Sequence, residues 1–167
     1  MLAAGKDFSS MESQEQQIGR DYLKENRGKV KAIIILNTSW QNVGLVADIC
    51  RDLGPQIPLF TSFQSKLILF KLFPHLRNRV ITVEKDREVK FGDFAGNFLP
   101  LGSYLVGNLA LKIHYSQSSF YFLEGFVLSS LLNNNLLFPP RFPEDFHQFL
   151  TQRKKNTYLI TSLQGLH

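Results

Sequence analysis

Apolar runs alternate with polar turns along the first half of the chain, and their spacing predicts alternating strands and helices. After a polar N-terminal region with a short helix at 21–26, residues 29–36 (KVKAIIIL) become wholly apolar over their last five positions. That pattern is typical of a strand covered on both faces. Polar Asn37, Thr38 and Ser39 end the strand. A helix is predicted next, up to Gly54, from the helical spacing of Val43, Val46, Ala47, Cys50 and Leu53.

The same alternation continues and then changes. We predict a strand at 58–61, a helix from Ser62 or Gln64 to about Phe73, and a strand at 79–84, as in an α/β sheet with crossover helices. Beyond Lys85 the strands follow one another directly, at 89–101, 109–115 and 120–126, with a hairpin turn at 116–119. Strand 109–115 is predicted to have one covered face, because large apolar residues alternate with Ala110, Lys112 and His114.

The last part of the chain is predicted to contain a loop, a helix and a final strand. Three Asn and three Pro residues mark a loop at 133–143. A helix is expected from Pro143 to about Gln152, and a strand at 157–161 (TYLIT). Because little chain follows that strand, we interpret 1–167 as one domain that is a fragment or is truncated.

The composition of the chain indicates its net charge and its expected cellular compartment. The formal net charge of +5, with a pI near 9.4, favours phosphate-rich or acidic partners without identifying one. Cys50 is the single cysteine, so a reducing cytoplasm is expected. The sequence has no signal-peptide pattern and no apolar run of the roughly 20 residues that a membrane helix needs. We therefore expect a cytoplasmic protein with no membrane contact.

Residues 24–44 (KENRGKVKAIIILNTSWQNVG) resemble the segment of bacterial ribonuclease J in which the metal motif HxHxDH follows a strand. Other segments resemble further motifs of that family in the same order, namely 4–8, 58–60, 89–94, 102–104, 109–113 and 121–126. The resemblance covers most of the chain and implies an α/β fold, part of the metallo-β-lactamase αββα sandwich, with mixed β-sheets flanked by helices. The family's β-CASP insertion and C-terminal domain would lie beyond His167, and its first hairpin before Met1.

The chain departs from this family at the metal ligands. Histidines and aspartates of the family hold two zinc or manganese ions, which generate the hydroxide that attacks phosphate. Amides, a hydroxyl or glycines stand at the matching positions, which are Asn37, Ser39, Gln41, Asn42, Gly102 and Gly125 (or Glu124 if the alignment slips by one residue). Neutral oxygens are poor donors to these cations. The comparison with the family therefore implies no metal cofactor and a catalytically inactive member, a pseudoenzyme.

Several residues allow two interpretations. Asn37 and Ser39 either bind an anion at a helix N-terminus or cap the following helix, and capping is favoured. Trp40 either stacks on a base, anchors a partner, or fills the emptied metal pocket. Asp48 and Asp52 form an i, i+4 pair that we interpret as a solvated helix face, and Cys50 is expected to be buried. No two histidines have the short spacing in the sequence that a metal-binding motif uses. The four histidines are His75, His114, His147 and His167.

Basic residues suggest an RNA-contacting surface. The candidate contacts are Trp40, Arg77, Arg79, Lys85 and Arg87. Further basic residues occur at Arg27, Lys29 and Lys31 and at 153–155. The alternative is an ordinary charged surface, because Glu84, Asp86 and Glu88 are interspersed.

The expected function is that of a catalytically inactive ribonuclease J-like protein. It would be a subunit or scaffold in RNA processing or decay, with weak contact to the RNA backbone. Expected partners are an active ribonuclease J paralogue and RNA, within a homo- or hetero-oligomer. Two alternatives stay open: an active metal-dependent ribonuclease or other hydrolase with its site outside this chain, and a protein-interaction remnant unrelated to RNA. Enzymatic activity is thus undecided, and the missing ligands weigh against it.

Overall fold

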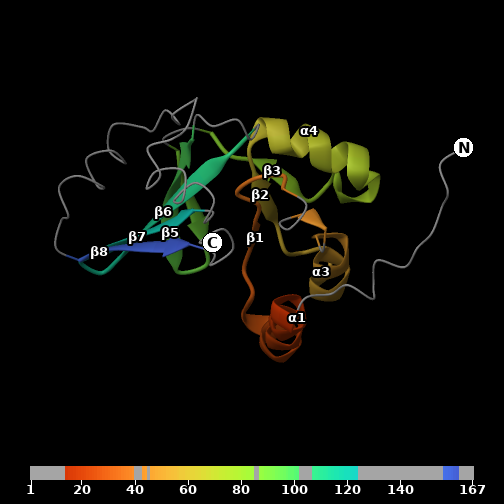
Figure 1. The fold of residues 1–167 in the computed structure, drawn as a ribbon, viewed down its shortest axis with the longest axis horizontal. Coiled ribbons are helices and arrows are strands. Elements are labelled where there is room, and N and C mark those ends of the chain that lie inside the picture. Colours follow the sequence, from red (N-terminus) through yellow and green to blue (C-terminus); the bar gives the residue numbers. More distant parts are fainter. Residues whose placement is uncertain are drawn as a thin grey trace, which may run out of the picture.

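Two β-sheets lie face to face in the computed structural model, and helices cover the outer face of one of them (Figure 1). The structure describes residues 14–39, 43–44, 46–84, 87–101, 107–123 and 156–161. Helix α1 spans Gln14–Asn26 and is followed by the short 3-10 helix η2 at Arg27–Lys29. It begins earlier than the short helix that the sequence predicts at 21–26. Among these residues, no helix is long and apolar enough to cross a bilayer.

The first sheet, called the parallel sheet below, consists of β1 (Ile33–Ile34), β2 (Leu59–Thr61) and β3 (Val80–Thr82) in that order. Both strand pairs are parallel. The crossovers contain α3 (Val46–Leu53) and α4 (Phe63–Leu72), and the short 3-10 helix η3 (Pro74–Leu76) precedes β3. These helices cover one face of the sheet, where a buried cluster joins helix and strand residues: Ile35, Val43, Val46, Cys50, Leu59, Leu69, Leu76 and Val80.

The second sheet, called the mixed sheet below, has the order β4-β5-β6-β7-β8. Its strands are β4 (Glu88–Phe91), β5 (Phe94–Pro100), β6 (Leu109–Tyr115), β7 (Ser118–Leu123) and β8 (Thr157–Thr161). Strands β4 to β7 pair antiparallel, whereas β8 pairs parallel with β7. A second apolar cluster, with Phe60, Phe91 and Phe98 in edge-to-face contact, packs the two sheets together.

The structure confirms most of the predicted elements and corrects three strands. The long strand predicted at 29–36 is wrong: β1 has two residues, because η2 occupies 27–29 and only β2 pairs with it in the described part of the chain. Ile33 and Ile34 are accordingly only half-buried. The single strand predicted at 89–101 is also wrong. It is a hairpin, turned at Gly92 with a φ of 63°, between β4 and β5.

The alternation predicted for 109–115 does not describe β6. Its first residues are buried on both faces, Ala110 included, whereas Tyr115 at its end is 59% exposed. Burial follows the distance from the parallel sheet, so the position along the strand matters more than the face. Strand β8 has the predicted bounds, and the helix predicted from Pro143 to Gln152 lies outside the described residues.

Cys50 is buried, as predicted, and we expect its thiol to be unreactive in the folded chain. Burial raises the pKa of the Cys50 thiol, and the nearby Arg79 guanidinium partly offsets that rise. Iodoacetamide at pH 8 should alkylate Cys50 only after denaturant is added, which mass spectrometry of the intact chain can measure. The pKa of the Cys50 thiol is higher in the folded chain than in the unfolded chain. The contribution of this thiol to the free energy of unfolding is therefore present below about pH 8.5 and is lost as the pH rises above that value. Rapid native alkylation would contradict the burial.

Candidate functional site

Buried polar side chains gather where β1 and β2 end and β6 begins. We call this group the polar seam; its members are Asn37, Thr61, Ser62, Ser65 and Asn108. All five are at most 6% exposed. Buried polar groups are costly unless they are hydrogen-bonded, so their partners show what the seam does.

Asn37 organises the loop that leaves β1. Its side-chain Oδ1 accepts a hydrogen bond from the Ser39 backbone N–H at 2.9 Å, which is an Asx turn. The Ser39 carbonyl then accepts from the Val43 N–H at 3.1 Å. Both bonds lie before α3, which begins at Val46, so capping of that helix stays a prediction.

The remaining bonds of the polar seam join neighbouring elements. Thr61 Oγ1 donates to the Ile35 carbonyl at 3.0 Å, and Ser62 Oγ caps α4 by accepting from the Ser65 N–H. Ser65 Oγ lies 3.4 Å from the Gly107 carbonyl oxygen, and the Leu109 N–H donates to the Leu36 carbonyl at 2.8 Å. The seam therefore links the parallel sheet to the first residues of β6.

The contact between the polar seam and the chain before β6 leaves no room for a side chain at Gly107. Its φ is +77°, and an added Cβ would lie 2.4 Å from Ser62 Oγ and 2.8 Å from Ser65 Oγ. Gly107→Ala is therefore expected to lower the free energy of unfolding by about 1–3 kcal/mol in a urea titration. Gly19→Ala in α1 is the matched control, because nothing lies within 4 Å of its added Cβ. Equal stability of the two variants would contradict the close approach.

The described residues of the loop after β1, 37–39, offer no imidazole, thiolate or carboxylate to a divalent cation. Asn37 is fully buried, and its oxygen already accepts a main-chain hydrogen bond. In the described ranges, no group of three or more His, Cys, Asp and Glu side chains could hold a metal ion. The other positions compared with metal ligands, Gln41, Asn42, Gly102 and Gly125, lie outside those ranges, as does Glu124.

The described residues among the candidate RNA contacts differ in their exposure and in their partners. Arg79 donates to the Ile57 carbonyl through Nε and Nη2 (3.2 and 2.8 Å) and to the Cys50 carbonyl through Nη1 (2.6 Å), so its role is structural. Arg77 is exposed with its Cζ 5.8 Å from the Phe70 ring centroid. Arg87, beyond the other end of β3, contacts Glu84 at 3.4 Å. Trp40 and Lys85 lie outside the described residues.

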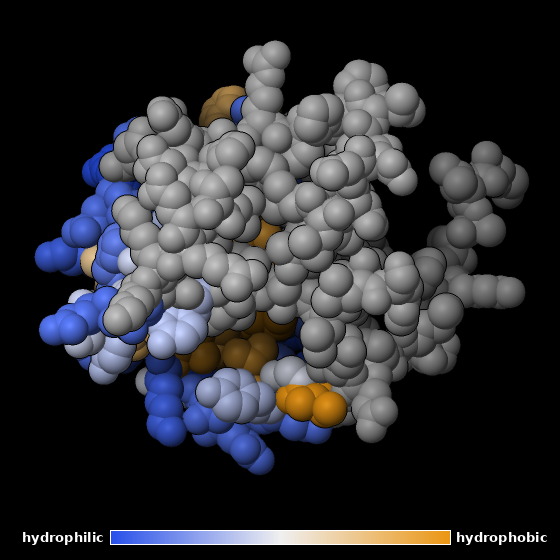
Figure 2. Space-filling model, turned by 60° about the vertical axis from the view of Figure 1, so that its left-hand side comes forward, coloured by the Kyte–Doolittle hydropathy of each residue, from blue (hydrophilic) through white to orange (hydrophobic). Residues whose placement is uncertain are grey.

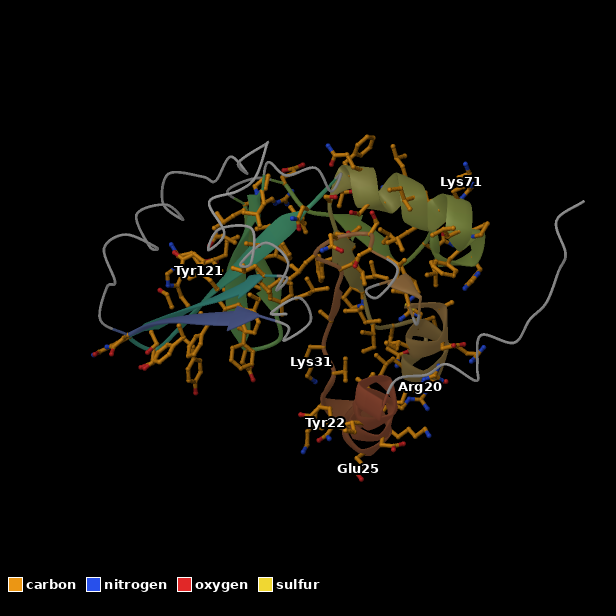
Figure 3. All side chains as sticks on the ribbon, in the orientation of Figure 1. Arg20, Tyr22, Glu25, Lys31, Lys71 and Tyr121 are labelled. Atoms are coloured by element: carbon orange, nitrogen blue, oxygen red, sulfur yellow. The ribbon has the colours of Figure 1, made fainter. Side chains whose placement is uncertain are left out.

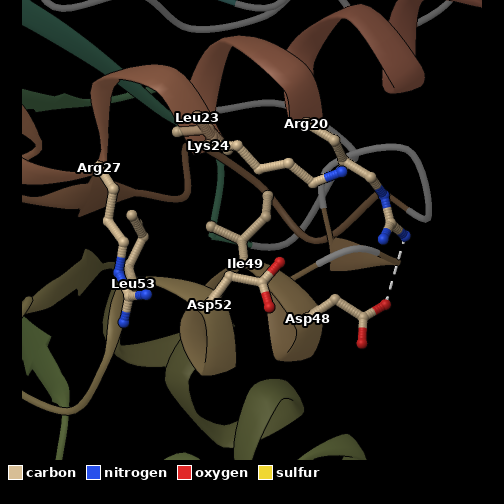
Figure 4. Close-up of a pocket in the computed structure, with 8 residues that line it drawn as sticks. All are labelled: Arg20, Leu23, Lys24, Arg27, Asp48, Ile49, Asp52 and Leu53. Atoms are coloured by element: carbon tan, nitrogen blue, oxygen red, sulfur yellow. Dashed lines mark hydrogen bonds and ion pairs between the residues drawn. The ribbon is translucent and has the colours of Figure 1, made fainter.

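A groove between α1 and α3, which the sequence did not reveal, has a volume of about 280 Å³ (Figure 4). Its α1 wall carries cations and its α3 wall carries Asp48 and Asp52. Arg20 reaches Asp48 across the groove at 3.4 Å, and Arg51 contacts the same carboxylate at 2.6 Å. Asp48 therefore links α1 to α3, whereas Asp52 is exposed and lies 4.0 Å from Arg51 of its own helix, in agreement with a solvated face.

The two described histidines lie apart from these features. His75 is exposed in η3, with its ring 6.3 Å from that of Phe73. His114 is exposed on β6, and its Nδ1 lies 2.9 Å from Ser119 Oγ. His147 and His167 are outside the described residues.

Comparison with known proteins identifies the fold. No protein-family model and no curated protein matches the sequence. Among solved structures, a mutant of the flavo di-iron protein from Thermotoga maritima matches with a TM-score of 0.55 at 14% identity, over 65% of this chain and 26% of that one. The metallo-β-lactamase MIM-2 matches with a TM-score of 0.54 at 14% identity, over 66% of this chain and 47% of that one.

A third solved structure extends over more of the chain. The subclass B3 metallo-β-lactamase BJP-1 of Bradyrhizobium japonicum has a TM-score of 0.53 at 14% identity, over 86% of this chain and 63% of that one. The chain thus spans less than two thirds of each of these structures. Structural matches at identities this low show the fold alone, and they do not show membership of the ribonuclease J family. The predicted fold class is confirmed: the chain has part of the metallo-β-lactamase fold.

Proposed function

We propose that this chain is a non-catalytic, ribonuclease J-like subunit or scaffold in RNA processing or decay. The observation that carries the proposal is the state of Asn37, where the sequence resemblance puts the first metal ligand. Its side chain is buried and neutral, and its oxygen is committed to the Ser39 N–H. Holding two divalent cations requires imidazole, thiolate or carboxylate donors, and among the compared positions only the alternative match Glu124 would supply one. Without such cations, water is not acidified for attack on a phosphodiester.

Contact with RNA is proposed to be weak and sequence-independent. The support is the net charge of +5 and exposed cations such as Arg77, Lys29 and Lys31. Such contacts go to phosphates and weaken as salt rises. The proposed protein partner is an active ribonuclease J paralogue, because a chain without its own metal centre needs an active subunit to take part in RNA cleavage.

Metal analysis tests the absence of catalysis. The full chain, freed of any affinity tag, is dialysed with excess zinc or manganese, separated from unbound metal, and assayed by mass spectrometry for bound ions. We expect no stoichiometric metal and no cleavage of labelled RNA. Two tightly bound ions per chain, or metal-dependent cleavage, would overturn the proposal.

RNA binding is tested separately, with a labelled single-stranded oligonucleotide at low and at physiological salt. We expect measurable binding at low salt that weakens by at least about tenfold at physiological salt. Absence of binding at both salts would remove RNA from the proposal and leave a role in protein contact. Reconstitution with a purified active ribonuclease J, followed by gel filtration, tests the scaffold role; separate elution at micromolar concentrations would contradict it.

A further inference from the structure

Helix α4 has apolar side chains on the face that points away from the parallel sheet. Its buried residues are Ser65 and Leu69. Phe63 and Leu67 are 58% and 54% exposed, and Phe70 is half-buried. Successive residues of a helix are about 100° apart, so Phe63, Leu67 and Phe70 follow one another along the side opposite the buried one. We call these three residues the α4 stripe.

An apolar stripe is unusual on the outer face of a surface helix, which is typically polar. On the mixed-sheet side, which comes forward in Figure 2, the described hydrophobic residues are largely recessed behind hydrophilic ones. The α4 stripe differs, because its central residue Leu67 is more than half exposed. A contiguous apolar patch of this kind marks an interaction site when polar residues surround it.

Cations border the α4 stripe on both sides. At about 100° per residue, Lys66 lies on one side of the stripe and Lys71 on the other. Figure 3 shows Lys71 projecting from α4 away from the two sheets. Lys66 Nζ and Arg77 Cζ lie 5.4 and 5.8 Å from the centroid of the Phe70 ring, so both charges are held beside the stripe. Among the described residues, no ion pair includes Lys66, Lys71 or Arg77.

The charges of this part of the chain have one sign. Between Asp52 and Glu84 the sequence contains no acidic residue. The two long segments outside the described residues, 1–13 and 124–155, together carry five acidic and five basic side chains, so they have no excess of negative charge. Apolar side chains bordered by cations are complementary to apolar side chains bordered by carboxylates. Charge therefore favours an acidic partner over these segments of the chain as the occupant of the α4 stripe.

We propose that the α4 stripe docks an amphipathic helix of a partner protein, in which acidic residues border an apolar side. Helices pack by interlocking rows of side chains that are three or four residues apart, which is the spacing of the α4 stripe. Carboxylates of the partner would pair with Lys66 and Lys71 at the rim of the apolar contact. The inference goes beyond the proposed function, because it rests on these side chains and not on the resemblance to ribonuclease J.

Other occupants fit the α4 stripe less well. Binding to an anionic membrane typically uses about four to eight clustered Lys and Arg residues, whereas three border this stripe, Lys66, Lys71 and Arg77. Single-stranded RNA stacks its bases on exposed rings, but the central residue here is Leu67 and two cations already lie beside the Phe70 ring. A second copy of this chain would place the lysines of one α4 against those of the other.

Binding is measured with the full chain and a fluorescent synthetic helical peptide that has leucines at i, i+4 and i+7 between glutamates. At physiological salt we expect saturable binding, and at least about tenfold weaker binding of a peptide in which lysines replace the glutamates. Lys71→Glu should weaken binding of the acidic peptide by at least about threefold. Lys90→Glu, at an exposed position of β4, changes the net charge equally and should stay within about twofold of the unmodified chain.

Leu67→Gln tests the apolar contact, because glutamine and leucine have similar helix propensities. We expect the acidic peptide to bind this variant at least about tenfold more weakly. Leu72→Gln is the matched control. Leu72 is 48% exposed on the same helix but lies about 140° around its axis from Leu67, so binding should stay within about twofold. The urea midpoint of both variants should stay within about 0.5 M of that of the unmodified chain.

Absence of saturable peptide binding, or equal binding to Leu67→Gln, would overturn the proposal. A larger fall of the urea midpoint in Leu67→Gln would show that the chain's own residues cover the α4 stripe, and would also overturn it. Phosphatidylserine vesicles and a single-stranded RNA oligonucleotide are tested in parallel. If Leu67→Gln weakened binding to either of them as much as binding to the peptide, the α4 stripe would belong to a membrane or RNA contact instead. A dimer that Leu67→Gln converts to monomer in sedimentation would make a second copy the occupant.

Discussion

Phe98→Ala is expected to lower the free energy of unfolding by about 3–5 kcal/mol. Phe98 is fully buried in β5, and its ring contacts Phe91 edge-to-face at 6.0 Å between ring centroids in the core that joins the two sheets. Truncation removes the transfer free energy of the ring and leaves a cavity that two hydrogen-bonded sheets cannot easily close. Urea unfolding followed by circular dichroism measures the difference.

Phe94→Ala is the matched control for this variant. Phe94 is on the same strand and the same face but 47% exposed, so its loss should cost less than about 1 kcal/mol. If Phe94→Ala were as destabilising as Phe98→Ala, the Phe94 ring would be covered in the folded chain, against its observed exposure.

Arg79→Leu is expected to cost about 2–4 kcal/mol. The guanidinium holds the Ile57 and Cys50 carbonyls, which lie just before β2 and within α3, so its removal leaves two acceptors without this donor. Arg79→Lys keeps the charge but not the planar fork, and should recover only part of the loss. Thermal and urea unfolding give the comparison.

Arg77→Leu, two residues earlier, separates the structural role from a surface role. Arg77 is exposed and its guanidinium lies over the Phe70 ring, so its loss should change stability by less than about 1 kcal/mol. A larger effect of Arg77→Leu than of Arg79→Leu would contradict the assignment of Arg79 to the fold. The same pair, assayed for RNA binding, should show the greater loss for Arg77→Leu.

The chain has part of the metallo-β-lactamase fold, and among its described residues buried neutral side chains lie between the two sheets. The polar seam joins the end of β1 to the start of β6 by hydrogen bonds. Hydrogen bonds between neutral groups are sufficient to hold such a junction.

The sequence by itself determined the elements whose signals are local. The spacing of Val46, Cys50 and Leu53 predicted α3. The sequence also predicted α4, from Ser62 or Gln64 to about Phe73, and β8 at 157–161. It also determined the chemistry of the compared metal positions, because a neutral side chain is neutral in any fold. Their placement in space beyond Asn37 and Ser39 stays a prediction.

Only the tertiary structure decided which surfaces are covered. Burial along β6 depends on how far the parallel sheet reaches over it, and the shortness of β1 depends on which strands lie beside it. Arg79 resembles a surface cation in the sequence, and only the positions of the Ile57 and Cys50 carbonyls make it structural. Such contacts join residues more than 20 positions apart, so no local pattern contains them.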